Sequence, residues 1–253
     1  FGAAAGNPSD PKVPYGQGLA NLQEQGIGPV NFSFDYNFIV DRDLDGATLT
    51  EGEELEGQWY LFRLGYNINE YIEPYLSMGL SNLNASFNQY GNFVKVNAAN
   101  AFAIGGGGKI MLFEIPESNI RISGDAHYLY SDSSVDKVKI NSVNNPNISI
   151  TDFKIHEWQI SAMLSREFFI NYSNWHTRDV FSFLPYLGVG YIDSSTKTEF
   201  NLNGLEYELD AGNDKKVVFL TGLNVTSPDN ISINVEGRWF GETAGSGGIT
   251  LKF

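Results

Sequence analysis

The sequence predicts an all-β protein, one antiparallel, up-and-down transmembrane β-barrel of about ten strands, within a range of roughly eight to twelve. Three observations support this prediction. Apolar and polar residues alternate along many segments of the chain. The links between these segments are alternately long and short. Aromatic residues cluster near the ends of the segments. No stretch of useful length shows the 3.6-residue period of an amphipathic helix.

The clearest alternating segment is residues 29–40, PVNFSFDYNFIV. Its even-numbered positions are all Val, Phe or Tyr, whereas four of its odd-numbered positions are Asn, Ser or Asp. Because successive side chains of a strand point to opposite faces, one face is aromatic and the other is polar. The aromatic face either packs on a second sheet in a soluble sandwich or contacts lipid in a transmembrane barrel.

Nine further segments continue the strand signal to the last residue. We predict strands at 29–41, 55–69, 72–82, 99–113, 119–131, 151–166, 179–193, 215–227, 231–239 and 249–253. The links after the first, third, fifth and seventh strands are long and polar, and those after the second, fourth and eighth are only a few residues. Links six-to-seven and nine-to-ten break this alternation. A barrel with short turns at one rim and long loops at the other produces the pattern.

Two smaller regularities accompany the strands. Aromatic residues near the predicted strand ends are typical of interfacial girdles. These residues are Trp59, Tyr60, Tyr66, Tyr71, Tyr128, Tyr130, Tyr191, Trp239 and Phe240. A weak repeat relates residues 74–79, PYLSMG, to residues 185–190, PYLGVG. In the long link at 194–213, the pair Asn203-Gly204 favours a hairpin.

Composition excludes several classes of protein. No window approaches the roughly 18–20 apolar residues of a membrane helix, which excludes a helical membrane protein. A net charge of −14 argues against nucleic acid as a partner, and the absence of cysteine excludes disulfides and thiolate chemistry. Because the chain starts at Phe1 without a basic and apolar leader, we expect an exported protein whose signal peptide has been removed. Residues 1–28 then form a periplasmic arm or plug segment, and residues 29–253 form the barrel.

The last seven residues, GGITLKF, place apolar side chains at Ile249, Leu251 and Phe253. They resemble the assembly signal of small outer-membrane β-barrel proteins of diderm (Gram-negative) bacteria, and the strand pattern of residues 29–253 fits the same resemblance. It implies an outer-membrane location, with the lipid bilayer, lipopolysaccharide and the barrel-assembly machinery as partners, and leaves a homo-oligomer or an envelope lattice open. The opening GNPSDP faintly resembles chlamydial major outer membrane proteins, but those are larger and rich in cysteine, so their function is not carried over.

If the apolar faces contact lipid, the polar faces line the lumen. Their charged residues and one histidine are Asp35, Arg63, Glu73, Lys109, Arg121, Asp125, His127, Glu157, Glu236 and Arg238. Opposite charges in a water-poor interior must pair, so we expect a ladder of ion pairs that fills the lumen. In a wider barrel the same groups would line a narrow path for ions or small solutes; about ten strands favours the filled lumen.

An acidic string in the first long link suggests a metal site. Asp41, Asp43 and Asp45, followed by Gly46, form the first half of an oxygen-rich calcium loop. Gly52 stands where the complete motif has a bidentate Glu, and the string lies between strands instead of helices. We therefore favour a solvated acidic loop over a weak calcium site with these three ligands, and we expect no other cofactor.

The sequence therefore favours a passive, non-enzymatic outer-membrane barrel, as a narrow porin-like channel or a structural, surface-exposed envelope protein. A secreted, soluble all-β module that binds glycans is the alternative, because its strands would show the same alternation. An outer-membrane protease ranks third. Asp125 and His127 lie two residues apart on one polar face, but the pair is mid-strand and lacks a second acidic pair.

Overall fold

The computed structural model describes residues 30–46, 50–69, 71–89, 92–141, 143–144, 149–173, 178–202, 205–228 and 230–253. The expectations for residues 1–28, including the segment GNPSDP, and for the turn pair Asn203-Gly204 fall outside these ranges. Among the described residues, no helix is long and apolar enough to cross a membrane.

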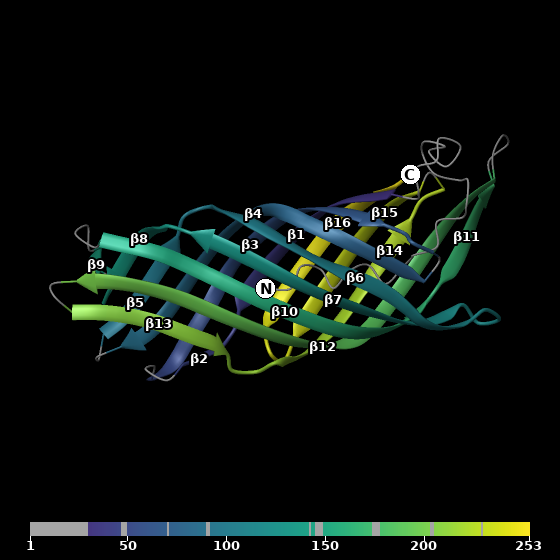
Figure 1. Ribbon diagram of the computed structural model, residues 1–253. Helices are drawn as coiled ribbons and strands as arrows, with labels where there is room; N and C mark the ends of the chain where they lie inside the picture. Colours follow the sequence, from purple (N-terminus) through teal and green to yellow (C-terminus); the bar gives the residue numbers. More distant parts are fainter. Residues whose placement is uncertain are drawn as a thin grey trace.

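The chain folds into a closed antiparallel barrel of ten wall strands, which confirms the predicted architecture (Figure 1). The wall strands are β1 (Val30–Asp41), β3 (Thr50–Tyr66), β4 (Ile72–Gln89), β6 (Ala101–Ile115), β7 (Ile120–Ser133), β10 (Ser149–Arg166), β12 (Arg178–Leu202), β14 (Val217–Thr226), β15 (Ile231–Trp239) and β16 (Thr243–Lys252). Each pairs with the next, and β1 pairs with both β3 and β16. This last pairing closes the sheet on itself, so the wall has no free edge.

Six shorter strands extend the wall at its two ends (Figure 1). At one end, here the loop end, lie β2 (Leu44–Asp45), β5 (Asn92–Ala98), β8 (Val135–Ile140), β9 (Val143–Asn144) and β13 (Leu205–Asn213). At the other, the turn end, β11 (Phe168–Ser173) pairs with the start of β12. The β11–β12 hairpin therefore accounts for the irregular link between the sixth and seventh strands.

The long links predicted as polar loops after the third and fifth strands, at 83–97 and 132–149, are largely β-structure over their described residues, so those predictions are wrong. The first holds the end of β4 paired with β5, and the second holds β8 and β9. Their strands still alternate, but the outward residues are short polar ones such as Asn84 and Ser86. A run of Asn and Ser resembles a loop in sequence, because these residues are typical of turns and loops.

The last strand is also longer than predicted. It begins at Thr243 instead of Ile249 and pairs with β1 and β15 along its length. Gly245, Gly247 and Gly248 lie among its first six residues. Because glycine has no side chain, this part shows no apolar alternation in the sequence.

Along β4 the two faces exchange character. In the turn-end half, apolar side chains face outward and polar ones face inward, whereas beyond Ser81 the order is reversed. The outward residues are Ile72, Leu76, Met78 and Leu80, followed by Asn82, Asn84 and Ser86; the inward residues are Glu73, Ser77 and Ser81, followed by Leu83, Ala85 and Phe87. The outer face of the wall therefore changes from apolar to polar along a single strand.

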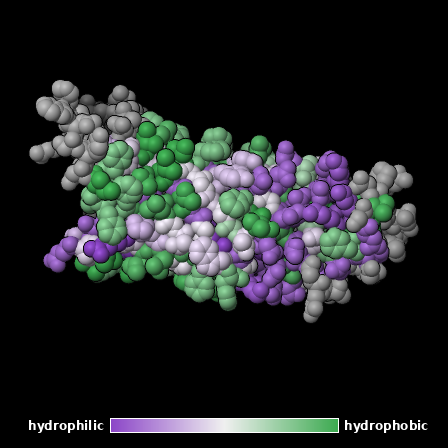
Figure 2. Space-filling model, turned by 180° about the vertical axis from the view of Figure 1, so that it is seen from behind, coloured by the Kyte–Doolittle hydropathy of each residue, from purple (hydrophilic) through white to green (hydrophobic). Residues whose placement is uncertain are grey.

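Large apolar side chains face outward from all ten wall strands and form an apolar belt. One member from each strand is Phe34, Phe62, Leu76, Ile110, Ile122, Ile160, Leu187, Phe219, Val235 and Ile249. Figure 2 shows hydrophobic residues gathered over the turn-end half and the middle of the barrel, and hydrophilic residues over the loop end. Phe32, Phe34 and Phe38 are 39–50% exposed, so they are not packed between two sheets as a soluble sandwich requires.

Inside the loop end, buried apolar side chains form a core, here the apolar core. It contains Ile39, Leu44, Leu55, Trp59, Leu61, Leu83, Ala85, Phe87, Val94, Val96, Ala98, Ala103, Leu129, Val138, Phe153, Ile155, Ala211 and Ala244. The prediction that Trp59 belongs to an outer girdle is wrong, because this side chain is fully buried. Tyr60 faces outward, and adjacent residues of a strand cannot share a face.

Candidate functional site

All the charged residues and the histidine predicted for the lumen lie on the inward faces of the wall strands. Nine are buried, namely Asp35, Arg63, Glu73, Arg121, Asp125, His127, Glu157, Glu236 and Arg238, and Lys109 is half-buried. They do not form one ladder. The structure groups them into separate clusters: one follows neighbouring wall strands from β1 to β7, and another joins the β1–β2 and β15–β16 links to β10 across the interior.

The first group, here the Asp125 cluster, joins four wall strands. Arg63 Nη2 of β3 lies 3.0 Å from Asp35 Oδ2 of β1, and the Arg63 guanidinium lies 4.6 Å from the centre of the Tyr75 ring of β4. The Tyr75 hydroxyl donates to Asp125 Oδ1 of β7 at 3.0 Å, and the same oxygen lies 3.0 Å from His127 Nδ1. The burial of Asp125 is therefore compensated by hydrogen bonds.

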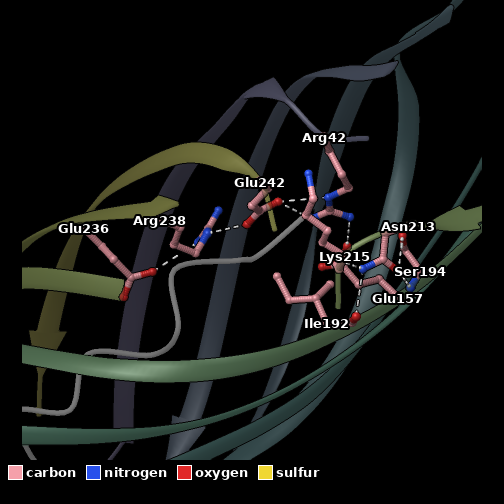
Figure 3. Close-up of polar contacts among 9 residues, drawn as sticks. All are labelled: Arg42, Glu157, Ile192, Ser194, Asn213, Lys215, Glu236, Arg238 and Glu242. Carbon is pink, nitrogen blue, oxygen red and sulfur yellow. Dashed lines mark hydrogen bonds and ion pairs between the residues drawn. The ribbon is translucent and has the colours of Figure 1, made fainter. Parts of the chain in front are cut away.

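The second group, here the Arg42 cluster, is drawn in Figure 3. Arg42 comes from the link between β1 and β2, yet its side chain is buried inside the barrel. Its Nη1 lies 2.8 Å from Glu157 Oε2 of β10, and its Nε donates to Glu242 Oε2 at 2.9 Å. Arg238 Nε of β15 donates to the other oxygen of Glu242 at 2.7 Å, and its Nη1 contacts Glu236 at 3.1 Å.

The Arg42 cluster brings two guanidinium groups and three carboxylates into a space with almost no access to water. Removing these groups from water costs free energy, which only close pairing and hydrogen bonds recover. The pairs connect β10 to the β1–β2 and β15–β16 links, which lie far apart in the sequence. The cluster therefore ties links at the loop end to the wall.

Two tyrosines reach their carboxylate partners across a glycine. Tyr186 of β12, Gly222 of β14 and Glu236 of β15 lie directly opposite one another on neighbouring strands. The Tyr186 hydroxyl donates to Glu236 Oε2 at 2.9 Å, and a Cβ on Gly222 would lie 2.3 Å from the tyrosine ring. Tyr75 similarly crosses Gly107 of β6, where a Cβ would lie 2.7 Å from its hydroxyl. Glycine in these strands makes room for the ring.

Smaller polar clusters occupy the turn end. Glu73 Oε1 lies 3.4 Å from Lys109 Nζ, and Asn31 Nδ2 donates to Glu73 Oε2 at 3.0 Å. Arg121 contacts Glu114 at 3.1 Å and Glu167 at 2.6 Å. The interior is therefore polar at the turn end and apolar at the loop end, with the Asp125 and Arg42 clusters tying strands and links together by charge.

Sequence reasoning missed Arg42, Glu242, Tyr75 and Tyr186. The first two lie in links, where strand periodicity gives no orientation. The tyrosines had a signal, because both belong to the Pro-Tyr repeat at 74–79 and 185–190. Their partners Asp125 and Glu236 each follow fifty residues later. A repeat that carries inward tyrosines could have indicated two equivalent carboxylate contacts.

Asn213, the last residue of β13, holds the β13–β14 link beside the Arg42 cluster (Figure 3). Its Oδ1 accepts from the Ser194 backbone N–H at 3.0 Å, and its Nδ2 donates to the carbonyls of Ile192 and Lys215 at 2.9 Å each. One buried side chain thus satisfies three backbone groups of the loop end.

The acidic string of the first long link makes other contacts. The Asp43 carboxylate lies 2.8 Å from Lys215 Nζ, and the Asp43 backbone forms a bridge with Glu54. Asp41 ends β1, and Asp45 belongs to β2. Among the described residues, no group of three or more His, Cys, Asp or Glu could hold a metal ion. Calcium binding by Asp41, Asp43 and Asp45 therefore stays a prediction without structural support.

The C-terminal residues take part in closing the barrel. Ile249 is exposed and pairs with Phe34 of β1, and Leu251 is half-buried. The Phe253 ring meets the Phe32 ring edge to face at 5.5 Å, and its backbone N–H donates to Val30 at 3.0 Å. The C-terminal segment that resembles an assembly signal therefore belongs to β16, the strand that closes the barrel by pairing with β1.

The Asp125–His127 pair does not have the geometry of a protease site. Both side chains are at most 3% exposed, and Tyr75 covers the carboxylate. A peptide substrate needs access to the base, within about 3 Å of the proton that it removes. The arrangement fits a structural contact inside the barrel.

No protein-family model and no curated protein matches this chain. Solved structures similar to it include the transport unit of the autotransporter AIDA-I from Escherichia coli, at a TM-score of 0.43 and 10% identity over 89% of both chains. The outer membrane protein OprG from Pseudomonas aeruginosa gives 0.41 and 13%, over 90% of this chain and 96% of that one. The toluene transporter TbuX from Ralstonia pickettii gives 0.28 and 9%, over 93% and 91%. Similarities at this level carry no conclusion about function.

Replacing Gly222 with Ala should displace the Tyr186 ring, because the new methyl group would overlap it. We expect the free energy of unfolding to fall by about 1–3 kcal/mol, as for other overpacked sites. Gly247→Ala is the control, since its nearest neighbour would lie at 3.7 Å. Urea unfolding followed by tryptophan fluorescence measures the stability of both variants. Equal stabilities would contradict the passage of the Tyr186 ring over Gly222.

Replacing Arg42 with Met should leave Glu157 and Glu242 without this cation in a buried space. The expected loss is about 3–5 kcal/mol of unfolding free energy, as for other broken buried ion pairs. Lys215→Met, which breaks a solvent-exposed pair with Asp43, should change the unfolding free energy far less than Arg42→Met does. The same unfolding experiment compares them, and a small loss for Arg42→Met would show that the cluster is not needed for stability.

Glu53 at the loop end should make stability depend on pH. Burial and the nearby Asp45 carboxylate raise the pKa of Glu53 from 4.5 to about 7. Between these values the folded state holds a proton that the unfolded state has released, so stability falls as pH rises through this window. Glu53→Gln should remove this part of the slope, and the exposed neighbour change Glu54→Gln should retain it. Unfolding midpoints at pH 5 and pH 8 test this; an unchanged slope in Glu53→Gln would refute it.

Proposed function

We propose that the barrel spans the outer membrane of a diderm bacterium through its apolar belt. The change of polarity along β4 supports this proposal. In its turn-end half, apolar residues face outward and polar residues face inward, which is the arrangement of a strand whose outer face contacts hydrocarbon. Strand β10 shows the same exchange. Its outward residues change from Ile160 and Trp158 to His156, while inward Gln159 and Glu157 give way to Ile155.

We infer that the turn end faces the periplasm and the loop end the exterior. Bacterial barrels of this kind carry short turns inside and long loops outside. Aromatic pairs at the border of the belt support a membrane interface at this level, with ring centres of Tyr36 and Tyr60 at 5.1 Å and of Tyr128 and Trp158 at 4.7 Å. Lipopolysaccharide would then surround the loop-end half of the belt.

The function that the interior supports best is a structural, surface-exposed envelope protein whose lumen is closed by side chains. The observation that carries this proposal is the apolar core, in which Leu55, Trp59, Leu61, Phe87 and Ile155 are fully buried. A water-filled pore would leave such inward side chains exposed. The Arg42 cluster supports closure as well. Insertion by the barrel-assembly machinery through Ile249, Leu251 and Phe253, and association into an oligomer or lattice, belong to the same proposal.

A second candidate, a narrow channel, is favoured by one observation. Among the described residues, Asn37 and Gln159 are fully buried, and neither amide group has a hydrogen-bond partner for its oxygen or its nitrogen. Such groups are usually satisfied by ordered water. A file of water in the polar half of the lumen would satisfy them and would lead as far as the apolar core.

Planar-bilayer recordings separate the two candidates. We expect no discrete current steps from the wild-type protein, because the apolar core and the Arg42 cluster close the lumen. Insertion is checked by flotation of the same preparation with liposomes, and a porin of known conductance serves as the positive control. Steps from floated, inserted protein would contradict closure and favour the channel. Monodisperse protein in detergent-free buffer that fails to float would contradict the membrane barrel itself.

A further inference from the structure

We propose that the outer wall binds one membrane glycerophospholipid at the turn end, with an acyl chain in an apolar groove and its phosphate against Arg166. This inference rests on the membrane-spanning role proposed above. It assigns to one part of the belt a specific lipid contact in place of general contact with hydrocarbon.

The groove lies where β7, β10, β12 and β14 run side by side. Its lining includes Ile120, Leu164, Arg166, Phe168, Pro185 and Leu187. Its volume of about 400 Å³ falls in the ~300–1,000 Å³ range of ligand sites. Leu164, Phe168 and Leu187 are 45–61% exposed, so the groove opens to the outside of the barrel. Its surface therefore suits a hydrocarbon chain.

A break in the strand ladder accompanies the groove. Pairing of β10 with β12 stops at Ser165 and Tyr186, and it resumes with β11 at Phe168 and Phe183. Pro185 lies in the interval and has no N–H to donate. The wall is therefore less continuous here than along the paired parts of these strands, and its outer surface is hollowed at the same place.

Arg166 stands at the rim of the groove towards the turn end. It pairs with Ile120, the first residue of β7, directly after the β6–β7 turn. Its side chain is exposed, and its guanidinium lies 5.1 Å from the centre of the Phe168 ring. Leu164 of β10 and Leu187 of β12 lie closer to the loop end than Arg166 does. The groove thus runs from a cation at the rim into the belt.

The charges around Arg166 leave its guanidinium available to a lipid. Among the described residues that line the groove, Arg166 alone is charged, and in this part of the chain no carboxylate pairs with it. The neighbouring Glu167 instead contacts Arg121 at 2.6 Å and also bonds to Ser182. A cation at the membrane border is stabilised by an anion, and guanidinium groups bind phosphate with two parallel hydrogen bonds.

A glycerophospholipid matches this combination of one cation and one apolar groove. Its single phosphate stands at the head of its acyl chains, as Arg166 stands at the head of the groove. In the orientation proposed above, the turn end meets the periplasmic leaflet, whereas lipopolysaccharide lies in the opposite leaflet and carries several phosphates. The groove therefore favours the phospholipid.

Native mass spectrometry tests the site. Wild-type protein and variants are extracted with detergent from liposomes of phosphatidylethanolamine and phosphatidylglycerol, and bound lipid is counted as the detergent micelle is removed in the mass spectrometer. We expect one retained phospholipid on the wild type. Arg166→Gln should retain about fivefold to tenfold less, the effect of about one lost charge-assisted contact. Leu187→Trp, which fills the groove, should also lose the lipid.

Two matched variants serve as controls. Lys197→Gln removes a cation at the loop end, and Met78→Trp adds an indole to the outer face of β4, a strand that contributes no residue to the groove. Both should retain the lipid as the wild type does. The site would be overturned if Arg166→Gln retained as much phospholipid as the wild type, or if both control variants lost the phospholipid. It would also be overturned if only detergent or lipid A were found bound to the wild type.

Liposome flotation distinguishes this failure from a failure of the proposed function. Floated protein without an Arg166-dependent lipid would remove only the phospholipid site. Protein that does not float would remove the membrane barrel and the site together. Arg166 is exposed and absent from the interior clusters, so the Gln variant should fold even if Leu187→Trp does not.

Discussion

The pairing of β1 with β16 is the constraint on which the rest of the structure depends. It joins the two ends of the described chain over registers from Asn31 with Lys252 to Asp41 with Thr243. A sheet closed in this way satisfies its backbone groups within the wall, which is the condition for strands in hydrocarbon. Closure also creates an inside, so every second residue of each strand is removed from bulk solvent whatever its polarity. The clusters around Asp125 and Arg42 follow from that enclosure, because charges placed there must find partners.

Along single strands such as β4, the outward and inward residues exchange polarity at the same position, so the character of the interior changes where the character of the outer surface changes. Over the turn-end half, the wall is apolar outside and polar inside; at the loop end it resembles a water-soluble protein, with Phe87 and Phe153 in a core and Asn84 and Lys154 on the outward face. A lumen filled with side chains can hold either kind of residue, provided that polar groups pair. The outer surface has no such freedom, because it must match lipid or water. The position at which the outer face changes therefore marks the border of the membrane in the proposed arrangement.

Much of this architecture could be predicted from the sequence, because alternation over segments such as residues 29–40 fixes both strand and face. The strand count and the inward positions of residues such as Arg63 and Asp125 follow from that period. The polar hairpins of the loop end were missed because Asn and Ser on their outer faces resemble a loop, and the first six residues of β16 were missed because three of them are glycine. Arg42 and Glu242 could not be found this way. They lie in links, where only the folded chain determines which residues turn inward.

The paired tyrosines show how a barrel of ten strands can be filled without large loops inside it. An inward aromatic ring is long enough to pass over one neighbouring strand, but only if that strand presents no side chain there. Gly107 and Gly222 meet this requirement, and the hydroxyls of Tyr75 and Tyr186 then reach carboxylates on the strand beyond. Each ring thereby supplies both bulk for the lumen and a donor for a buried charge. Two copies of this arrangement, each introduced by a Pro-Tyr pair, fill opposite parts of the wall with few residues. The tyrosines thus fill part of the lumen from the wall strands, whereas the Arg42 cluster takes Arg42 and Glu242 from links and the apolar core takes Leu44, Val94 and Ala211 from the shorter strands.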